Sequence, residues 1–144
     1  MEKPANHVSK ASGVALICGN SVLLAKRSEF WHGEPVPFGG YWSIFGGSIE
    51  LNENAMSCAV RELEEEAEIS IATKELKFIK RFVDDFSEFI FYICEVPELL
   101  TPVLNFEHTE YGWFDINSLD SFPEKIDNKI VECIKLYNLD KLKE

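Results

Sequence analysis

Three glutamates in one short segment carry the clearest chemical signal in this chain. Glu62, Glu65 and Glu66 stand at i, i+3 and i+4, so a helix would place them on one arc of about 100°. Residues 54–67 contain neither Gly nor Pro and are rich in helix formers. Crowded carboxylates repel one another, and a hard divalent cation such as Mg²⁺ relieves that repulsion because it prefers oxygen ligands. The alternative is a solvated acidic face.

Glycines and charged residues at fixed spacing around the trio favour metal binding. Together they match the Nudix box, G-x5-E-x7-R-E-U-x-E-E-x-G-U with U aliphatic, at Gly47, Glu53, Arg61, Glu62, Glu65 and Glu66, with Leu63 and Ile69 at the aliphatic positions. The segment WSIFGGSIELNE is also similar to the family pattern W-x-x-P-G-G-x-x-E-x-G-E. The chain therefore resembles the Nudix hydrolases, which contain a MutT-like domain.

Three positions depart from the family pattern. Phe45 stands where Pro usually precedes the glycines, so the turn lacks the fixed φ of proline. Asn52 replaces a Gly, and Asn tolerates the left-handed region. Glu68 replaces the Gly that would end the helix, and Glu in that conformation costs roughly 1–2 kcal/mol. Every candidate ligand is retained, while the geometry after Glu66 stays open.

The resemblance implies a role for each acidic residue of the box. Glu65 and Glu66 are the expected main ligands of Mg²⁺ (or Mn²⁺), and Glu62 is a further ligand or a general base. The backbone carbonyl of Gly47 is another expected ligand, which suits a residue without a side chain. Bound ions of this kind acidify an attacking water and clamp a diphosphate.

Charged residues outside the trio complete the expected catalytic set. Arg61 lies one turn from Glu65, and the resemblance implies that it pairs with Glu53 and holds the glutamates in place. Glu110 is the candidate for an additional base or ligand, because several Nudix enzymes carry a glutamate on a loop in this region. A solvated loop carboxylate is the alternative reading of Glu110. His108 is expected to be a surface imidazole.

Substrate recognition rests on fewer residues. Phe30 and Trp31, in a turn-rich loop over 28–40, are candidates to stack on a nucleobase, and such stacking is worth about 1–3 kcal/mol. Arg27 and Arg81 are candidates to contact phosphate. The alternatives are aromatic rings that fold onto the domain and arginines in surface ion pairs. Signatures for ADP-ribose, NADH or coenzyme A substrates are missing or incomplete, so the substrate stays open.

The elements that position these residues are strands and helices in mixed order. The Gly19-Asn20 pair predicts a hairpin turn, and strands are expected at 13–18, 22–26, 42–45, 76–83, 88–96 and 111–114. The acidic helix would bury a stripe made of Met56, Ala59, Val60, Leu63 and Ala67. Pro123 suits the first turn of a last helix, whose inward stripe is Ile126, Ile130, Cys133, Ile134 and Tyr137. This order indicates an α+β fold with a central mixed sheet, and the resemblance implies a Nudix-type α/β/α sandwich formed by one domain over residues 1–144.

Composition excludes several classes of partner. The net charge of −11 argues against binding of bulk nucleic acid or an anionic membrane, because both call for a basic surface. The longest apolar run, Phe89–Cys94, is too short to span a bilayer. The four cysteines lack metal-site spacing, and Met1–Lys10 has no apolar leader. We therefore expect reduced thiols and a cytoplasmic location.

These observations favour a Mg²⁺-dependent hydrolase that cleaves the diphosphate linkage of a nucleoside diphosphate derivative. Nucleotide sugars or ADP-ribose-like compounds, dinucleoside polyphosphates and nucleoside triphosphates all remain candidates. A non-catalytic nucleotide-sensing module that keeps the fold is the alternative, and an acidic interaction domain without a ligand is a third. The intact glutamate trio favours the enzyme. The oligomeric state is left open, with a homodimer among the possibilities.

Overall fold

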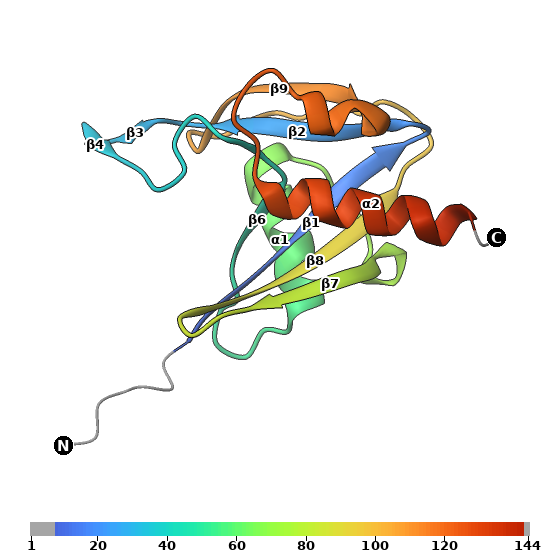
Figure 1. The fold of residues 1–144 in the computed structure, drawn as a ribbon. Coiled ribbons are helices and arrows are strands. Elements are labelled where there is room, and N and C mark those ends of the chain that lie inside the picture. The colour runs from blue at the N-terminus through green and yellow to red at the C-terminus, as the bar shows by residue number, and fades with distance from the viewer. Residues whose placement is uncertain (1–7, 143–144) are drawn as a thin grey trace.

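A mixed sheet with one helix on each face forms the body of the protein. The computed structural model describes residues 8–142, shown in Figure 1. The sheet order is β5-β2-β1-β8-β7, with β6 beside β1 and β9 beside β2. Its strands are β1 (Ser9–Cys18), β2 (Ser21–Arg27), β5 (Trp42–Ser43), β6 (Phe45–Ser48), β7 (Lys77–Val83), β8 (Ser87–Glu95) and β9 (His108–Asp115). The helices are α1 (Ala55–Ala67) and α2 (Asn128–Leu142). The expected α+β architecture is confirmed.

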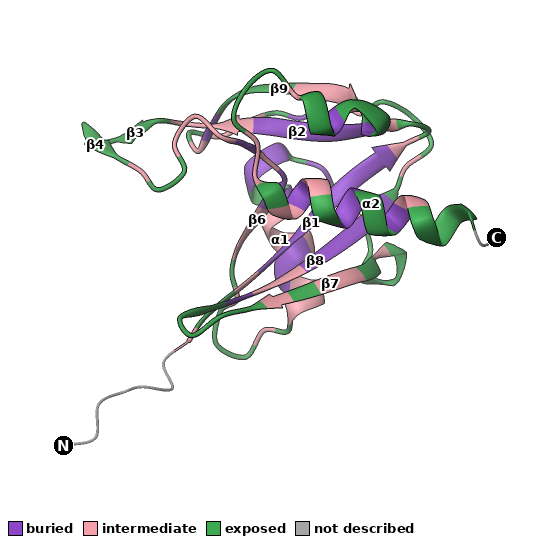
Figure 2. Ribbon diagram, in the orientation of Figure 1, coloured by how far each residue is buried: buried purple, intermediate pink, exposed green. Residues whose placement is uncertain are grey.

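Strand β1 is the centre of the sheet. It pairs in parallel with β8 and in antiparallel with β2 and β6. Because it is covered on both faces, its apolar run is continuous rather than alternating. Val14 and Leu16 pack with α1, whereas Ala15 and Ile17 pack with α2. Figure 2 shows the resulting band of buried residues along β1, β2 and β8.

The expected hairpin forms at Gly19-Asn20. Ile17 pairs with Val22 across it, and Gly19 adopts a positive φ of 59°. Strands β1, β2 and β9 run longer than the sequence predicted, whereas the strand expected over 42–45 is divided between β5 and β6. The expected loop over 28–40 contains a small hairpin of its own, β3 (Phe30–Trp31) and β4 (Glu34–Pro35).

Helix α1 begins and ends with identifiable caps. The side chain of Asn54 accepts a hydrogen bond from the N–H of Ser57 at 2.8 Å, which satisfies one of the free N–H groups at the helix start. Glu68 ends the helix in the left-handed conformation, with φ 56° and ψ 38°, and its N–H donates to the Glu64 carbonyl. The non-glycine residue therefore adopts the geometry expected of the family glycine. In the predicted stripe, Ala59, Leu63 and Ala67 are fully buried, and Met56 and Val60 partly so.

The last helix begins later than the sequence predicted. Pro123 was expected in its first turn, but α2 starts at Asn128, and a short 3₁₀ helix occupies Ile116–Ser121. The intervening chain is held extended against β5, because Trp42 exchanges backbone hydrogen bonds with Lys125 and Asp127. The predicted inward stripe of the helix is confirmed: Ile130, Cys133, Ile134 and Tyr137 are buried, while Ile126 packs against the same core from just before the helix.

The cysteines match the expectation of unpaired thiols. Cys58, Cys94 and Cys133 are buried and Cys18 is partly exposed, and all four are free. Of the helices in the part of the chain that the structure describes, none has the length and apolar character to cross a membrane. The amino-terminal arm, for which the sequence predicts no leader, lies outside the described residues up to residue 7.

Candidate active site

Arg61 organises the exposed side of the acidic cluster on α1. Its Nε and Nη2 donate to the two carboxylate oxygens of Glu53 at 2.7 and 3.0 Å. Its Nη1 donates to Glu62 at 2.9 Å and to Glu65 at 3.1 Å, and Nη2 also donates to the Ser48 carbonyl. These donors lower the pKa of Glu53 to about 2. One guanidinium thus fixes three carboxylates.

Glu66 lies on the buried side of the same cluster. Its side chain is only 1% exposed, whereas that of Glu65 is 54% exposed. One oxygen, Oε1, accepts a long hydrogen bond from the Gly46 N–H at 3.3 Å, and the other, Oε2, is buried without a hydrogen-bond partner in the described chain. Burial, together with the neighbouring Glu62 and Glu107 carboxylates, raises the pKa of Glu66 far above its ordinary value.

The two glycines of strand β6 fit closely between strand β1 and these carboxylates. A Cβ on Gly47 would lie 2.5 Å from the carboxylate carbon of Glu62, and one on Gly46 would lie 2.5 Å from the Ser12 carbonyl oxygen. Neither position can hold a side chain without moving its neighbours. The Gly47 carbonyl, an expected metal ligand, accepts a weak hydrogen bond from the Cys58 thiol at 3.4 Å.

A loop before β9 brings Glu107 to the cluster. Asn105 Nδ2 donates to the Glu65 carbonyl and the Asn105 N–H donates to the Glu66 carbonyl, each at 3.3 Å, so the loop is fixed to the end of α1. The Asn105 side chain also accepts from the Glu107 N–H at 2.9 Å. Burial and the nearby Glu62 charge raise the pKa of Glu107. The base candidate was expected within residues 105–110, and Glu110 was chosen there rather than Glu107, although an Asn two positions before Glu107 is a signal of such a turn.

Two neighbours of Glu107 lie elsewhere than the sequence suggested. Glu110 is on strand β9 rather than on a loop, is exposed, and forms an ion pair with Lys26 at 3.7 Å. His108 was expected at the surface, and that expectation is wrong: it is 5% exposed and packs edge-on against the Phe45 ring. The cause is that β9 already begins at His108. Burial and then the Arg27 charge lower the pKa of His108 to about 4.

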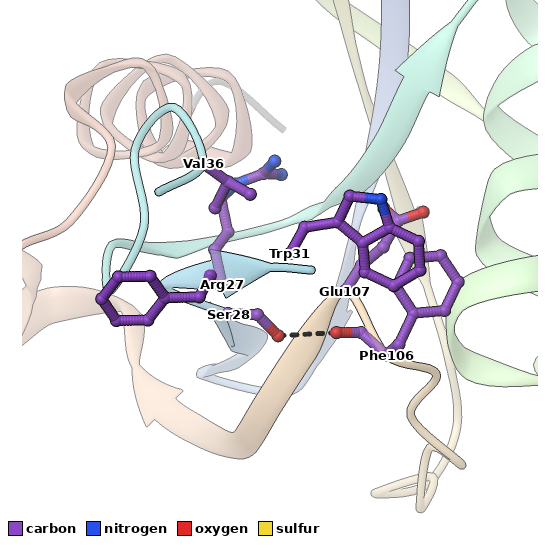
Figure 3. A pocket seen from close by; sticks show the side chains of 7 residues that line it. Arg27, Ser28, Trp31, Val36, Phe106 and Glu107 are labelled. Atoms are coloured by element: carbon purple, nitrogen blue, oxygen red, sulfur yellow. Dashed lines mark hydrogen bonds between the residues drawn. The ribbon is translucent and has the colours of Figure 1, made fainter. Parts of the chain in front are cut away.

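An aromatic cavity of about 250 Å³ adjoins the cluster at Glu107 (Figure 3). Trp31 and Phe106 are stacked there, with ring centroids 4.3 Å apart. Ser28 Oγ donates to the Phe106 carbonyl at 2.6 Å and so joins the two segments that carry the rings. Arg27 and Phe30 complete the wall. Three of the four predicted substrate-binding residues, Arg27, Phe30 and Trp31, therefore come together next to the carboxylates.

The fourth candidate, Arg81, does not join them. It is exposed on β7 and forms an ion pair with Glu88. It is not among the residues that line the aromatic cavity. This matches the alternative reading of Arg81 as a surface ion pair.

The carboxylates of the cluster are suitable ligands for a divalent cation, but their side chains do not yet converge on one point. Within residues 8–142, no three acidic, histidine or cysteine side chains surround a common point closely enough to hold a metal ion. The reason is that Arg61 holds Glu62 and Glu65. A buried carboxylate oxygen of Glu66 without a partner nevertheless calls for a cation or a proton. Glu65 is exposed, and it could turn toward Glu66 once its hydrogen bond with Arg61 breaks, so the residues fit a metal after a side-chain movement.

Both the sequence and the fold are similar to those of known proteins. Residues 8–137 match the NUDIX domain family. The fold is similar to that of a MutT protein from Methanosarcina mazei Go1 (TM-score 0.74, 18% identity, 98% of each chain covered). It is also similar to that of a C. elegans Ap4A hydrolase, with a TM-score of 0.68, 15% sequence identity, and 93% of this chain and 99% of that chain covered. A MutT/nudix family protein from Enterococcus faecalis is similar as well, with a TM-score of 0.65 and 22% identity. That match covers 80% of this chain but only 45% of the E. faecalis chain. No curated protein matches.

Proposed function

This chain belongs to the NUDIX family, and we propose that it is a Mg²⁺- or Mn²⁺-dependent pyrophosphohydrolase that cleaves the diphosphate linkage of a nucleoside diphosphate derivative. The observation that carries the proposal is the buried carboxylate of Glu66, which has one oxygen without a partner and lies beside two further carboxylates. A protein stabilises such a group by a proton or by a cation. In a family of hydrolases the cation is the functional choice.

The expected ligands are the side chains of Glu62, Glu65 and Glu66 and the carbonyl of Gly47. When bound there, a divalent ion supplies charge neutralisation for the phosphoryl oxygens and acidifies a water molecule. Arg61 orients Glu62 and fixes the end of strand β6 through the Ser48 carbonyl, so its role is to position rather than to react. The Cys58 thiol, which donates to the Gly47 carbonyl, is a weak donor and yields readily.

Glu107 is the residue best placed to take the proton from the attacking water. It borders both the carboxylate cluster and the aromatic cavity. Its raised pKa makes it a stronger base than an exposed glutamate, because the efficiency of a general base increases with its affinity for the proton. Glu110, the base candidate chosen from sequence, is instead paired with Lys26. We therefore assign the proton acceptor to Glu107, with Glu62 as the alternative.

The nucleotide would place its base in the aromatic cavity. Trp31 and Phe106 stack on each other, but they are 47% and 60% exposed, so their outer ring faces are available for stacking. Arg27 lines this cavity together with Glu107 and would contact phosphate. The free, buried thiols support action in a reducing, cytoplasmic environment.

Glu66→Gln tests the proposal. With Mg²⁺ and a panel of nucleotide substrates, kcat should fall at least 100-fold relative to the unsubstituted enzyme, because the variant loses a metal ligand while keeping its shape. Glu64→Gln is the matched control, since Glu64 lies on the same helix but is exposed and bonded to Ser70. Turnover by Glu66→Gln equal to that of Glu64→Gln would refute the assignment, and circular dichroism shows that both variants are folded.

A further inference from the structure

The carboxyl end of helix α1 is completed by a distant part of the chain. The last carbonyl groups of a helix lack partners within it and need donors from elsewhere. The Ala67 carbonyl accepts from the Val103 N–H at 2.8 Å. The Glu65 and Glu66 carbonyls accept from the side chain and the backbone of Asn105, each at 3.3 Å. This distant segment therefore supplies the donors that the end of the helix requires.

Asn105 also holds Glu107 through the opposite end of its side chain. While Nδ2 donates to α1, Oδ1 accepts from the Glu107 N–H at 2.9 Å. The Asn105 carbonyl accepts from the His108 N–H at 3.3 Å, which closes the turn between the end of the helix and strand β9. An asparagine that binds the N–H two residues later fixes the local direction of the chain. One amide side chain thus joins α1 to the residue assigned as proton acceptor.

Ser28 holds the same residue from the side of strand β2. Its N–H donates to the Glu107 carbonyl at 2.9 Å, and its hydroxyl donates to the neighbouring Phe106 carbonyl (Figure 3). Both peptide groups of Glu107 are therefore bonded, the N–H to Asn105 and the carbonyl to Ser28. Ser28 lines the aromatic cavity, whereas Asn105 is not among its lining residues. Loss of the Asn105 contact should accordingly displace Glu107 and leave the wall of the cavity in place.

The surroundings of Glu107 call for such an anchor. Its partly buried carboxylate lies near those of Glu62, Glu65 and Glu66. Like charges repel, and burial strengthens the repulsion because less water screens it. This repulsion drives the loop away from the cluster. The bonds from Asn105 oppose that displacement, because they tie the loop to the same turn of α1 that carries Glu65 and Glu66.

We propose that Asn105 is a positioning residue, which holds Glu107 at the carboxylate cluster in the geometry that proton transfer requires. This inference rests on the proposed function, in which Glu107 accepts the proton of the attacking water. Asn105 acts only through Glu107, because both ends of its amide are bonded within the protein, one to α1 and one to the turn. Its contribution therefore falls on kcat rather than on KM.

Asn105→Ala tests this role in the presence of Mg²⁺ and the nucleotide that the unsubstituted enzyme hydrolyses fastest. We expect kcat to fall about tenfold or more and KM to stay within about twofold, because a small displacement of a reacting group slows the chemical step. Mn²⁺ affinity should be unchanged, because the backbone N–H of residue 105 still binds the Glu66 carbonyl. Asn105→Ser should restore part of kcat, because a hydroxyl can accept from the N–H two residues later.

Asn54→Ala is the matched control. Asn54 caps the other end of α1, where its side chain accepts from the Ser57 N–H at 2.8 Å. Both alanine variants should lower the melting temperature by a few degrees, but Asn54→Ala should keep the kcat of the unsubstituted enzyme. Equal kcat in the two alanine variants would overturn the inference. So would a loss of Mn²⁺ affinity in Asn105→Ala that matches its loss of kcat, because the residue would then act through the metal ligands.

The double variant Asn105→Ala/Glu107→Gln separates positioning from a general weakening of the fold. If Asn105 acts through Glu107, the double variant should have the same kcat as Glu107→Gln alone. A further loss of about tenfold in the double variant would show an independent effect and overturn the inference. Unchanged turnover by Glu107→Gln would overturn the assignment of Glu107 and, with it, that of Asn105. Failure of the unsubstituted protein to hydrolyse any nucleotide would overturn the proposed function and the inference together.

Discussion

Arg61 and Glu66 lie five residues apart on α1, yet their surroundings are opposite. Around Arg61, three carboxylates bind one guanidinium of the protein itself. Around Glu66, two further carboxylates lie close by, and one of its own oxygens is buried without a partner in the described chain. The first region is complete as folded. The second gains stability only from a proton or an added cation. The comparison separates Glu53, whose two oxygens are both bonded to Arg61, from Glu66, which has one buried oxygen without a partner in the described chain.

The same substitution should have opposite effects on stability in the two regions. Without metal at pH 7, Glu66→Gln should stabilise the protein, because the unfolded carboxyl is ionised while the folded one must keep a proton. Glu53→Gln should instead lower the melting temperature, because it removes the ionised partner of Arg61. Urea unfolding of both variants measures the difference.

The pH dependence sharpens this comparison. The pKa of Glu66 is raised in the folded state, so above pH 4.5 the carboxyl ionises in the unfolded protein but keeps its proton in the folded one. The free energy of unfolding therefore decreases as the pH rises above 4.5. The advantage of Glu66→Gln should therefore shrink toward pH 5. If Glu66→Gln destabilised the metal-free protein at pH 7 as Glu53→Gln does, the distinction between the two regions would fail.

His108 should produce a slope of the opposite sign. Its pKa falls from 6.5 to about 4 on folding, so between these pH values His108 is protonated in the unfolded state but not in the folded one. The free energy of unfolding therefore decreases as the pH falls from 6.5 to 4. The loss should reach roughly 2 kcal/mol. Urea unfolding at several pH values should show a flatter profile for His108→Gln than for the unsubstituted protein. His32→Gln, at an exposed position, should keep the original profile, and a slope unchanged by His108→Gln would contradict the buried placement.

Glu68→Gly should give the smallest effect, a gain of about 1 kcal/mol or less in the free energy of unfolding. Glu68 adopts a left-handed conformation that costs a residue with a Cβ more than it costs glycine. Asn52→Gly is the matched comparison, since Asn52 also has a positive φ but tolerates it better. Thermal melting that shows a loss of stability in Glu68→Gly would mean that its side chain makes stabilising contacts.

The parts of this site that depend on residues close together in the sequence could be predicted from the sequence. Helix α1 follows from local composition and periodicity, and the family resemblance implied the contact of Arg61 with Glu53. The glycine pair, expected in a turn, lies instead within strand β6, where it pairs with β1. The burial of Glu66 depends instead on the loop that ends at Glu107, which crosses the end of α1 from forty residues away. No local pattern encodes that crossing. Glu110 was therefore chosen where Glu107 lies closer.

The fold shows the same division between local and distant causes. The hairpin at Gly19-Asn20 and the buried stripe of α2 followed from local signals. The start of α2 did not, because backbone pairing with Trp42 keeps residues 125–127 extended beyond Pro123. The burial of His108 likewise results from its pairing opposite Arg27 on β2. Both corrections arise from strand contacts that a single segment cannot reveal.

Calorimetric titration with Mn²⁺ tests the central claim, that the Glu66 region is built to receive a cation. The unsubstituted protein and Glu64→Gln should bind Mn²⁺ with equal affinity, and Glu66→Gln should bind it at least tenfold more weakly, because only the last loses a buried ligand. Equal Mn²⁺ binding by all three proteins, or no binding by the unsubstituted protein at millimolar Mn²⁺, would contradict the account.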